Sequence, residues 1–331
     1  MADVSEATVS YVINNTKNIT PEVKQRVLDA IKALDYHPNL LAKSLVTKET
    51  KHIAMLVDNI QNPHYGRILR GVQHVAEEKG YIVSILSANY SSKAAMFELI
   101  SRGVDGVILA VGSHTKDYSD LSLPMAMENS TLGISYRQAI FDMIETFHGL
   151  GHRRIAFLSG IPLEHPSHPR LHDLQDAMGC YRMDACPGLF INGTGVTDEN
   201  AGYEATDRLL ARGEVFTGIF AINDLMAIGA MKRLWEAGLK VPDDVSVAGC
   251  DGISNTAYTI PPLSTIQSHA FTLGSLLMHQ LLAEMHPERE LPPARQTIQA
   301  EFIRRESIGK ASRGNLPHHA QPIFSQKQNE R

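Results

Sequence analysis

The apolar and polar positions divide the chain into a short helical beginning and a longer part in which strand and helix patterns alternate. At the start, the segment VSEATVSYVINN covers residues 4–15. Within it Val9, Val12 and Ile13 follow the i, i+3, i+4 spacing of one helix face, and Ser5 is placed to act as the N-cap. A first short helix is therefore predicted here, and the polar residues Asn14-Asn15-Thr16 are expected to end it.

A second and stronger helical pattern follows in ITPEVKQRVLDAIKALDY, residues 19–36. Thr20 can cap this helix, Pro21 suits a first turn that needs no N–H group, and Glu22 complements the helix dipole. One apolar stripe runs along the segment and consists of Val23, Val27, Ile31 and Leu34. The pattern predicts a helix with one buried face.

From His52 onward, short apolar runs alternate with amphipathic helical segments. The runs have the length of buried strands and cover residues 52–58, 81–87, 105–111, 153–160, 216–222 and 244–251. The helical segments between them lie around residues 65–79, 94–102, 137–149, 200–212 and 224–237. Repeated β–α units form parallel sheets that are covered by helices on both faces, and about 250 residues of this pattern suit two lobes better than one sheet. The predicted fold class is α/β, with a two-lobed domain behind the N-terminal helices.

Composition and charge restrict the possible partners. The net charge is −5 at pH 7, and within residues 1–52 seven Lys and Arg face six acidic residues. Any contact with nucleic acid must therefore come from a local surface.

Cys180, Cys186 and Cys250 show neither ligand spacing nor a disulfide framework, as is typical of thiols in a reducing compartment. The chain has no signal peptide pattern and no membrane-spanning stretch, so a cytoplasmic protein without a membrane partner is expected.

Catalytic and metal-binding patterns are weak. His165, His168 and His172 lie in EHPSHPRLH, but prolines separate them and no obvious acidic or cysteine ligand completes a set, so a solvent-exposed loop is expected. The sequence has no glycine-rich phosphate loop, no G-x-S-x-G motif and no paired carboxylates on one motif. We therefore expect no cofactor and no enzymatic activity.

Two short helices joined by a polar turn are typical of part of a helix-turn-helix unit, whose second helix lies in the DNA major groove. On the first predicted helix, hydroxyl, amide and small side chains suited to phosphates or base edges share the exposed face: Ser5, Glu6, Ala7, Ser10, Tyr11 and Asn14. The residue types alone leave the alternative of a plain helical hairpin with a solvated polar face open.

Several blocks of the sequence resemble the lactose/galactose-repressor (LacI/GalR) family of transcriptional regulators. These blocks occur in family order from residue 4 to about 305: VSEATVSYVINN, TPEVKQRVLDAIKALDYHPNLLAKSL, GHRRIAFLSG, FAINDLMAIGAMKRLWEAGLKVPDDVSVAGCDGI and PPLSTIQ. The resemblance implies an N-terminal helix-turn-helix domain, a hinge helix and an effector domain like the periplasmic sugar-binding proteins. It also implies a homodimer that binds double-stranded operator DNA and a small, sugar-like effector.

The resemblance assigns a domain to each part of the chain. The helix-turn-helix domain would cover residues 1–37, the hinge and linker 38–51, the two-lobed effector and dimerisation domain 52–309, and a disordered tail 310–331. The residues that it places on DNA through the recognition helix are Ser5, Glu6, Ala7, Thr8, Ser10, Tyr11 and Asn14. Among them Glu6, Ala7 and Tyr11 fall on the positions that usually select bases.

The same resemblance makes Pro38 to Val46 the hinge helix. Asn39 and Ala42 would lie at the minor groove, and Leu45 would be the apolar wedge that two subunits insert between base pairs. Such a wedge offsets an unstacking cost of about a few kcal/mol per step by bending the duplex around more protein surface. The alternative for Leu45 is a linker leucine that packs on the effector domain.

For the effector site, the resemblance selects two residues of the first lobe, Asp58 and Tyr65. From the second lobe it selects Arg170, Asn223 and Asp251. Carboxylate, guanidinium and amide groups around one cleft suit hydroxyl-rich ligands, because each can form paired hydrogen bonds. Alternatives remain open, in which Asp251 shapes a turn, Arg170 is a surface charge in a His/Pro-rich loop, and Asn223 is a helix N-cap.

The chain departs from the family pattern at its start. A segment like the family's first helix is missing before Val4, so the apolar face of Val9, Val12 and Ile13 would stay exposed to water at about 25 cal/mol per Å². Either the coding sequence starts further upstream, or this copy cannot fold its DNA-reading part. The second explanation leads to an alternative function, a solute-binding or sensor module that has lost DNA binding.

Two further departures concern the effector domain. The run at residues 121–140 is expected to lack the loop and strand by which family members cross from the first lobe to the second. Asp173 and Leu174 stand where the family usually has glycine and an aromatic residue after the arginine.

Overall fold

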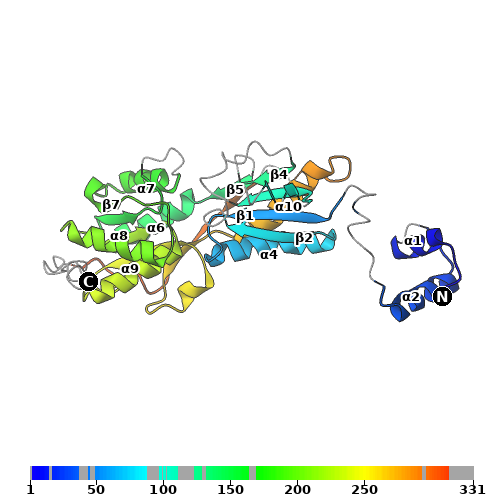
Figure 1. The fold of residues 1–331 in the computed structure, drawn as a ribbon. Helices are drawn as coiled ribbons and strands as arrows, with labels where there is room; N and C mark the ends of the chain where they lie inside the picture. The colour runs from blue at the N-terminus through cyan, green and yellow to red at the C-terminus, as the bar shows by residue number, and fades with distance from the viewer. Residues whose placement is uncertain are drawn as a thin grey trace. The chain divides into compact units, whose positions relative to one another are not determined.

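The computed structural model contains two compact units, Met1–Thr50 and Lys51–Arg331 (Figure 1). The described residues are 2–14, 17–36, 44, 49–87, 97–98, 100–101, 103–110, 123–128, 132–163, 169–292 and 296–312. The helices and strands that are named below lie within these ranges.

The N-terminal unit contains the two predicted helices, α1 (Glu6–Asn14) and α2 (Pro21–Ala33). Ser5 caps α1 as predicted, because its hydroxyl oxygen accepts a hydrogen bond from the Thr8 amide at 3.2 Å. Thr20 occupies the N-cap position of α2, but its side chain makes no capping hydrogen bond there. Pro21 instead begins the helix with a preset φ angle. Val12 and Val27 form the buried centre of this small unit.

The first lobe of the second unit is built on a four-stranded parallel sheet in the order β2-β1-β3-β4. Its strands are β1 (His52–Val57), β2 (Ile82–Ser87), β3 (Gly106–Ala110) and β4 (Met125–Met127). Both faces of β1 are buried, since Ile53, Met55 and Val57 enter one apolar cluster and Ala54 and Leu56 another. A strand that is covered on both faces explains the continuous apolar run in the sequence.

Two helices that are distant in sequence pack together on the first lobe, α4 (Pro63–Glu78) and α10 (Ala270–Met285). Their contact depends on glycines, because a Cβ atom on Gly71 would lie 2.0 Å from the Phe271 carbonyl oxygen. A Cβ atom on Gly274 would lie equally close to the Ile68 carbonyl oxygen. Only the absence of a side chain lets the two backbones approach this closely.

The second lobe contains a six-stranded sheet in the order β12-β10-β9-β8-β6-β7, in which only the β10–β12 pair is antiparallel. The strands are β6 (Ile155–Leu158), β7 (Phe190–Ile191), β8 (Gly218–Ala221), β9 (Ser246–Asp251), β10 (Ser264–Gln267) and β12 (Glu301–Ile303). The helices are α6 (Arg137–Gly149), α7 (Pro169–Cys180), α8 (Glu199–Ala211) and α9 (Asp224–Glu236), with 3-10 turns η2 (Pro187–Leu189) and η3 (Ser254–Ala257). The two lobes with parallel sheets confirm the predicted fold class.

The chain passes between the lobes after β5 (Leu132–Ser135), after β10, and after β11 (Gln296–Gln299). β5 and β11 pair in parallel, with Leu132 opposite Gln296. The expectation that residues 121–140 lack a crossover strand is therefore wrong. β5 is only four residues long, and its partner β11 lies more than 150 residues later, so no local sequence pattern indicates this strand.

At the beginning of the second unit, Lys51 is held by contacts with distant segments. Its ammonium group donates to the Tyr81 hydroxyl at 3.1 Å and lies 4.3 Å from the centre of that ring. The same hydroxyl is 2.8 Å from His286 Nε2, just beyond the end of α10. The Lys51 amide also donates to Asp105 at 2.8 Å. The first residue of the unit is thus tied to the end of α10 and to the loop before β3.

His152, which lies just ahead of β6, is a buried structural residue. Its ring packs edge-on against Phe147 and bridges the Thr217 hydroxyl (2.8 Å) and the Gly309 carbonyl (3.1 Å). Because a carbonyl only accepts, Nε2 carries the proton and Nδ1 accepts from Thr217. Burial lowers the pKa of His152 below its ordinary value of 6.5, and the neutral ring is therefore the folded form.

This environment predicts a pH-dependent contribution to stability. Because the unfolded chain binds a proton at His152 near pH 6.5 and the folded chain only at lower pH, the free energy of unfolding must fall as the pH drops below 6.5. In urea denaturation from about pH 7.5 to about pH 5.5, the stability advantage of the wild type over His152→Gln should shrink. An advantage that stays constant over this range would contradict the assignment.

A buried ion pair between α8 and α9 gives a second stability prediction. Arg233 is 1% exposed and donates through Nε to Asp207 at 2.8 Å. Asp207→Ala would leave the guanidinium buried without its counter-charge and should cost about 3–5 kcal/mol in urea denaturation. Asp207→Leu combined with Arg233→Met should recover most of this loss. A single-variant loss below about 1 kcal/mol would show that the pair is not strongly coupled.

Candidate functional site

Four of the five residues that were assigned to the effector site lie near one another where the two lobes meet. Asp58 directly follows β1, Tyr65 lies in the first turn of α4, and Asp251 ends β9. The Tyr65 hydroxyl donates to Asp58 Oδ2 at 3.0 Å. Burial raises the pKa of Tyr65, the charges of Asp58 and Asp251 raise it further, and Arg170 opposes them. Four of the five predicted residues therefore act on one another electrostatically.

Asp251 is the carboxylate at which the two lobes meet. It is 5% exposed, and its Oδ2 accepts a hydrogen bond from Asn62 Nδ2 at 3.1 Å. Its backbone has a φ of 115°, a conformation that non-glycine residues rarely adopt, and Ser268 donates to its carbonyl at 3.1 Å. Asp251 does shape a turn, as the alternative interpretation stated, but the same turn directs its carboxylate toward the first lobe.

Arg170 lies in the first turn of α7 and not in a loop, which corrects the expectation from its His/Pro-rich surroundings. Its guanidinium lies 4.2 Å from the centre of the Tyr136 ring and donates to the Ile222 carbonyl at 2.6 Å. Burial alone would lower the pKa of Arg170, but Cys250, Tyr136 and Asp251 outweigh it and raise the pKa. The side chain is directed into the second lobe, so it is not a simple surface charge.

Asn223 is the N-cap of α9, as the alternative interpretation predicted. Its Oδ1 accepts from the Met226 amide at 2.9 Å, and its Nδ2 donates to the Thr197 carbonyl at 2.8 Å. The side chain is 5% exposed. A role in effector binding stays a prediction for this residue, and both ends of its amide already have protein partners.

Sequence reasoning missed Asp224, the residue next to Asn223. Its fully buried carboxylate accepts hydrogen bonds from the Ile253 amide at 2.8 Å and from the Thr265 hydroxyl at 2.5 Å. Burial raises the pKa of Asp224 well above its ordinary value, and Asp251 raises it further. A Cβ atom at Gly249 would lie 2.3 Å from Asp224 Oδ1, so the glycine in GCDGI marked this close approach. Asp224 fixes the turn that carries Asp251.

The two departures from the family pattern after Arg170 have structural roles in α7. Leu174 is fully buried and joins the core of the second lobe. Asp173 accepts from Arg137 Nη1 at 2.9 Å, and the same nitrogen reaches Asp176 at 2.8 Å. The substituted positions thus serve the packing of α6 and α7.

The predicted DNA-reading residues follow α1. Ser5, Glu6, Ala7 and Ser10 are exposed, and Thr8 and Tyr11 are half-exposed. The Ser5 hydroxyl is engaged by the cap and by Thr8 Oγ1 at 2.9 Å. Lys17, which the sequence did not single out, donates to the Tyr11 hydroxyl at 3.2 Å and lies over its ring. The side chain of Asn14 lies outside the described residues, and so do Asn39, Ala42 and Leu45.

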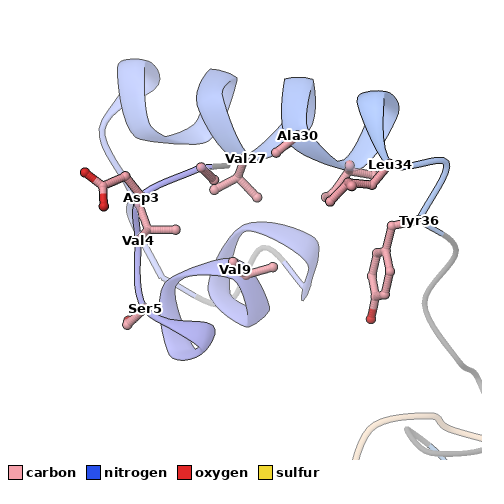
Figure 2. A pocket seen from close by; sticks show the side chains of 10 residues that line it. Asp3, Val4, Ser5, Val9, Val27, Ala30, Leu34 and Tyr36 are labelled. Carbon is pink, nitrogen blue, oxygen red and sulfur yellow. The ribbon is translucent and has the colours of Figure 1, made fainter.

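An apolar groove of about 620 Å³ opens between α1 and α2 (Figure 2). It is lined by Ala2, Asp3, Val4, Ser5, Val9, Val27, Ala30, Ile31, Leu34 and Tyr36. The expectation that the whole apolar face of α1 stays exposed is only partly right, because Val12 is buried and Val9 lines the groove. The apolar face of α1 is therefore buried at Val12 and open to the groove at Val9.

Among the described residues, no three or more His, Cys, Asp or Glu side chains form a cluster that could hold a metal ion. No helix in the described part of the chain combines the length and apolar character needed to cross a membrane. His172 lies on α7, whereas His165 and His168 fall outside the described residues.

Comparisons with known proteins agree with both units. Residues 1–39 match "Bacterial regulatory proteins, lacI family", and residues 144–308 match "Periplasmic binding protein-like domain". The HTH-type transcriptional repressor PurR of Haemophilus influenzae (strain PittEE) is 30% identical over 327 residues, which cover 93% of this chain and 96% of that protein.

Solved structures give the same result for the fold. The crystal structure of the lac repressor dimer bound to operator and the anti-inducer ONPF has a TM-score of 0.78 and 24% identity, covering 93% of this chain and 96% of that one. A LacI family transcriptional regulator from Enterococcus faecium with bound ribose has a TM-score of 0.67 and 26% identity, covering 79% of this chain and 100% of that one.

An N-terminal helical unit ahead of a two-lobed, periplasmic-binding-protein-like unit defines a class of bacterial transcription regulators. The chain belongs to the LacI family of bacterial regulatory proteins, which confirms the family that the sequence blocks predicted.

Proposed function

We propose that this protein is a transcriptional repressor that binds operator DNA and changes its affinity for the operator when a sugar-like molecule binds between the lobes. The observation that carries the proposal is that Asp58, Tyr65, Arg170 and Asp251 lie near one another where the two lobes meet, with Tyr65 bonded to Asp58 and Asp251 bonded to Asn62 of the other lobe. Such a repressor acts on chromosomal DNA, so we place it in the cytoplasm. A ligand that favours one arrangement of the lobes can shift DNA affinity by a coupling of about 1–3 kcal/mol.

The DNA-binding part of the proposal rests on α1 and the segment that follows α2. The exposed face of α1 presents Glu6, Ala7 and Ser10, and Tyr11 is accompanied by the ammonium group of Lys17. A cation beside an aromatic hydroxyl suits phosphate contact, while the other side chains suit base edges. Asn39, Ala42 and Leu45 are proposed as minor-groove contacts from the resemblance alone.

The effector part of the proposal concerns the chemistry of the cluster. Carboxylates at Asp58 and Asp251 accept hydrogen bonds from hydroxyl groups, and the Arg170 guanidinium donates them. A family member with bound ribose, the regulator from Enterococcus faecium, supports a hydroxyl-rich ligand as the first class to test. Asn223 contributes to this site through the position of α9, whose first turn also supplies Asp224.

A homodimer is the proposed assembly. The lac repressor structure of similar fold is a dimer bound to operator.

Operator binding can be tested in gel-shift experiments with the full-length gene product and the DNA next to its own gene. Tyr11→Ala should weaken specific binding about 5- to 150-fold, the equivalent of about 1–3 kcal/mol for a specific contact. Gln25→Ala, an exposed change on α2, is the matched control and should bind like the wild type. Binding should also weaken with rising salt.

A wild-type protein that forms dimers yet binds no specific fragment at low salt would refute the repressor function. The open groove between α1 and α2 would then favour the second candidate function, a sensor module that responds to ligand without binding DNA.

Effector binding can be tested by thermal denaturation with a panel of pentoses, hexoses and disaccharides that includes D-ribose. A ligand at 100 times its Kd stabilises the folded protein by about 2.7 kcal/mol. Asp251→Asn should abolish the increase in Tm that an active compound produces, because it replaces the acceptor carboxylate with an amide. Asp243→Asn changes an exposed carboxylate and should retain the increase. If Asp251→Asn retained the full increase, the proposed site would be wrong.

A further inference from the structure

The first turn of α4 is bonded directly to the end of β9 across the lobe junction. Asn62 is the N-cap of α4 and is 4% exposed. Its Oδ1 accepts from the His64 amide at 2.9 Å, which fixes the orientation of the side-chain amide. The Nδ2 group consequently points away from the helix, where it donates to Asp251 Oδ2 at 3.1 Å. Capping of the helix and bonding between the lobes use opposite ends of one side chain.

Two neighbouring contacts join the same segments. Arg67, one turn further along α4, donates through Nη1 to the Gly252 carbonyl. The His64 ring lies 3.2 Å from Ser268 Oγ and 3.9 Å from Asp251 Oδ1. Asn62, His64 and Arg67 all belong to the first lobe, whereas Asp251 and Gly252 belong to the second. The junction is therefore bridged by a set of short polar contacts and not by apolar packing alone.

The turn that follows β9 in the second lobe is also held by contacts within that lobe. Asp224 holds the Ile253 amide, and the Gly252 amide donates to Thr265 Oγ1 at 3.2 Å. With its backbone held on both sides of Gly252, the turn cannot follow α4 by bending when the lobes move. We therefore expect relative motion of the lobes to strain the bond between Asn62 and Asp251.

We infer that Asn62 is a positioning residue of the effector site that presets the Asp251 carboxylate and holds the two lobes together before any small molecule binds. A carboxylate has about four acceptor positions, of which Asn62 uses one, so a ligand hydroxyl can bind Asp251 while this bond persists. A bound ligand then adds to an existing link between the lobes. The role of this link in the response to an effector rests on the proposed function. The hydrogen bond between Asn62 and Asp251 does not.

The inference can be tested without DNA or effector by measuring the distance between the lobes. Gln73→Cys places a label on the exposed face of α4, and the native, exposed Cys180 carries the second label at the end of α7. Cys186→Ser removes the other accessible thiol, and the buried Cys250 should not react. Labelled chains are diluted into an excess of unlabelled protein, so that each measured pair lies within one chain.

Asn62→Ser and Asn62→Asp separate the two roles, because both side chains retain a capping oxygen. Serine is too short to reach Asp251, and aspartate places a second carboxylate against it. We expect Asn62→Ser to broaden the wild-type distance distribution and Asn62→Asp to lose its main population, with longer distances in its place. The exposed neighbouring change Gln61→Ser should leave the distribution unchanged.

Thermal denaturation of each variant should show one cooperative transition, which confirms that the capped helix still folds. If Asn62→Asp folds and keeps the wild-type distances, the bond does not hold the lobes and the inference is overturned. If Asn62→Asp does not fold, Asn62→Ser alone decides, and an unchanged distribution overturns the inference. Failure of operator or sugar binding would affect neither result.

Discussion

The arrangement of the second unit depends on the burial of one carboxylate where two independently packed lobes meet. A buried charge is costly unless donors or counter-charges surround it. Asp251 meets this requirement with partners from both lobes, since Asn62 donates to it directly and Arg170 is held nearby over Tyr136. Neither lobe contains all the groups that this carboxylate needs, so its burial requires the lobes to be in contact.

The same requirement explains the unusual backbone of the β9 turn. Asp251 adopts a φ that is rare for a side chain with a Cβ atom, and Asp224 maintains the turn from the interior of the second lobe. Backbone conformations of this type persist only where the surroundings over-determine them, and they cluster at functional sites. Here the surroundings include Asp224, whose pKa is raised by burial and by Asp251, while hydrogen bonds from Thr265 and Ile253 oppose that shift.

The sequence allowed prediction of the features whose signal is local. The apolar runs predicted the central strands of both sheets, because a strand that is buried on both faces has apolar residues at consecutive positions. The pattern at residues 137–149 predicted α6 with the bounds that it has. β5 and β11 were not predicted, since each is short and acquires its place only by pairing with the other. Arg170 was placed in a loop because prolines and histidines around it hid the start of α7.

At the site, the family resemblance selected charged residues that do come together, but it did not reveal the residues that hold them. Asn62 belongs to an Asn-Pro pair that reads as an ordinary helix start, and its second bond spans 189 positions in sequence. Asp224 was not selected, because the evident capping role of its neighbour Asn223 explained this position of the sequence. Residues that act through a distant partner leave no periodic or compositional trace, so only the three-dimensional arrangement identifies them.

The glycine contact between α4 and α10 has a mechanical consequence. With backbones this close at Gly71 and Gly274, neither helix can slide or roll without steric overlap, so the pair turns as one stiff body. Its one end carries Asn62 and lies beside Ser268, and its other end is joined through His286 and Tyr81 to Lys51. A rotation of this helix pair at the lobe junction would therefore also displace Lys51, the first residue of the second unit.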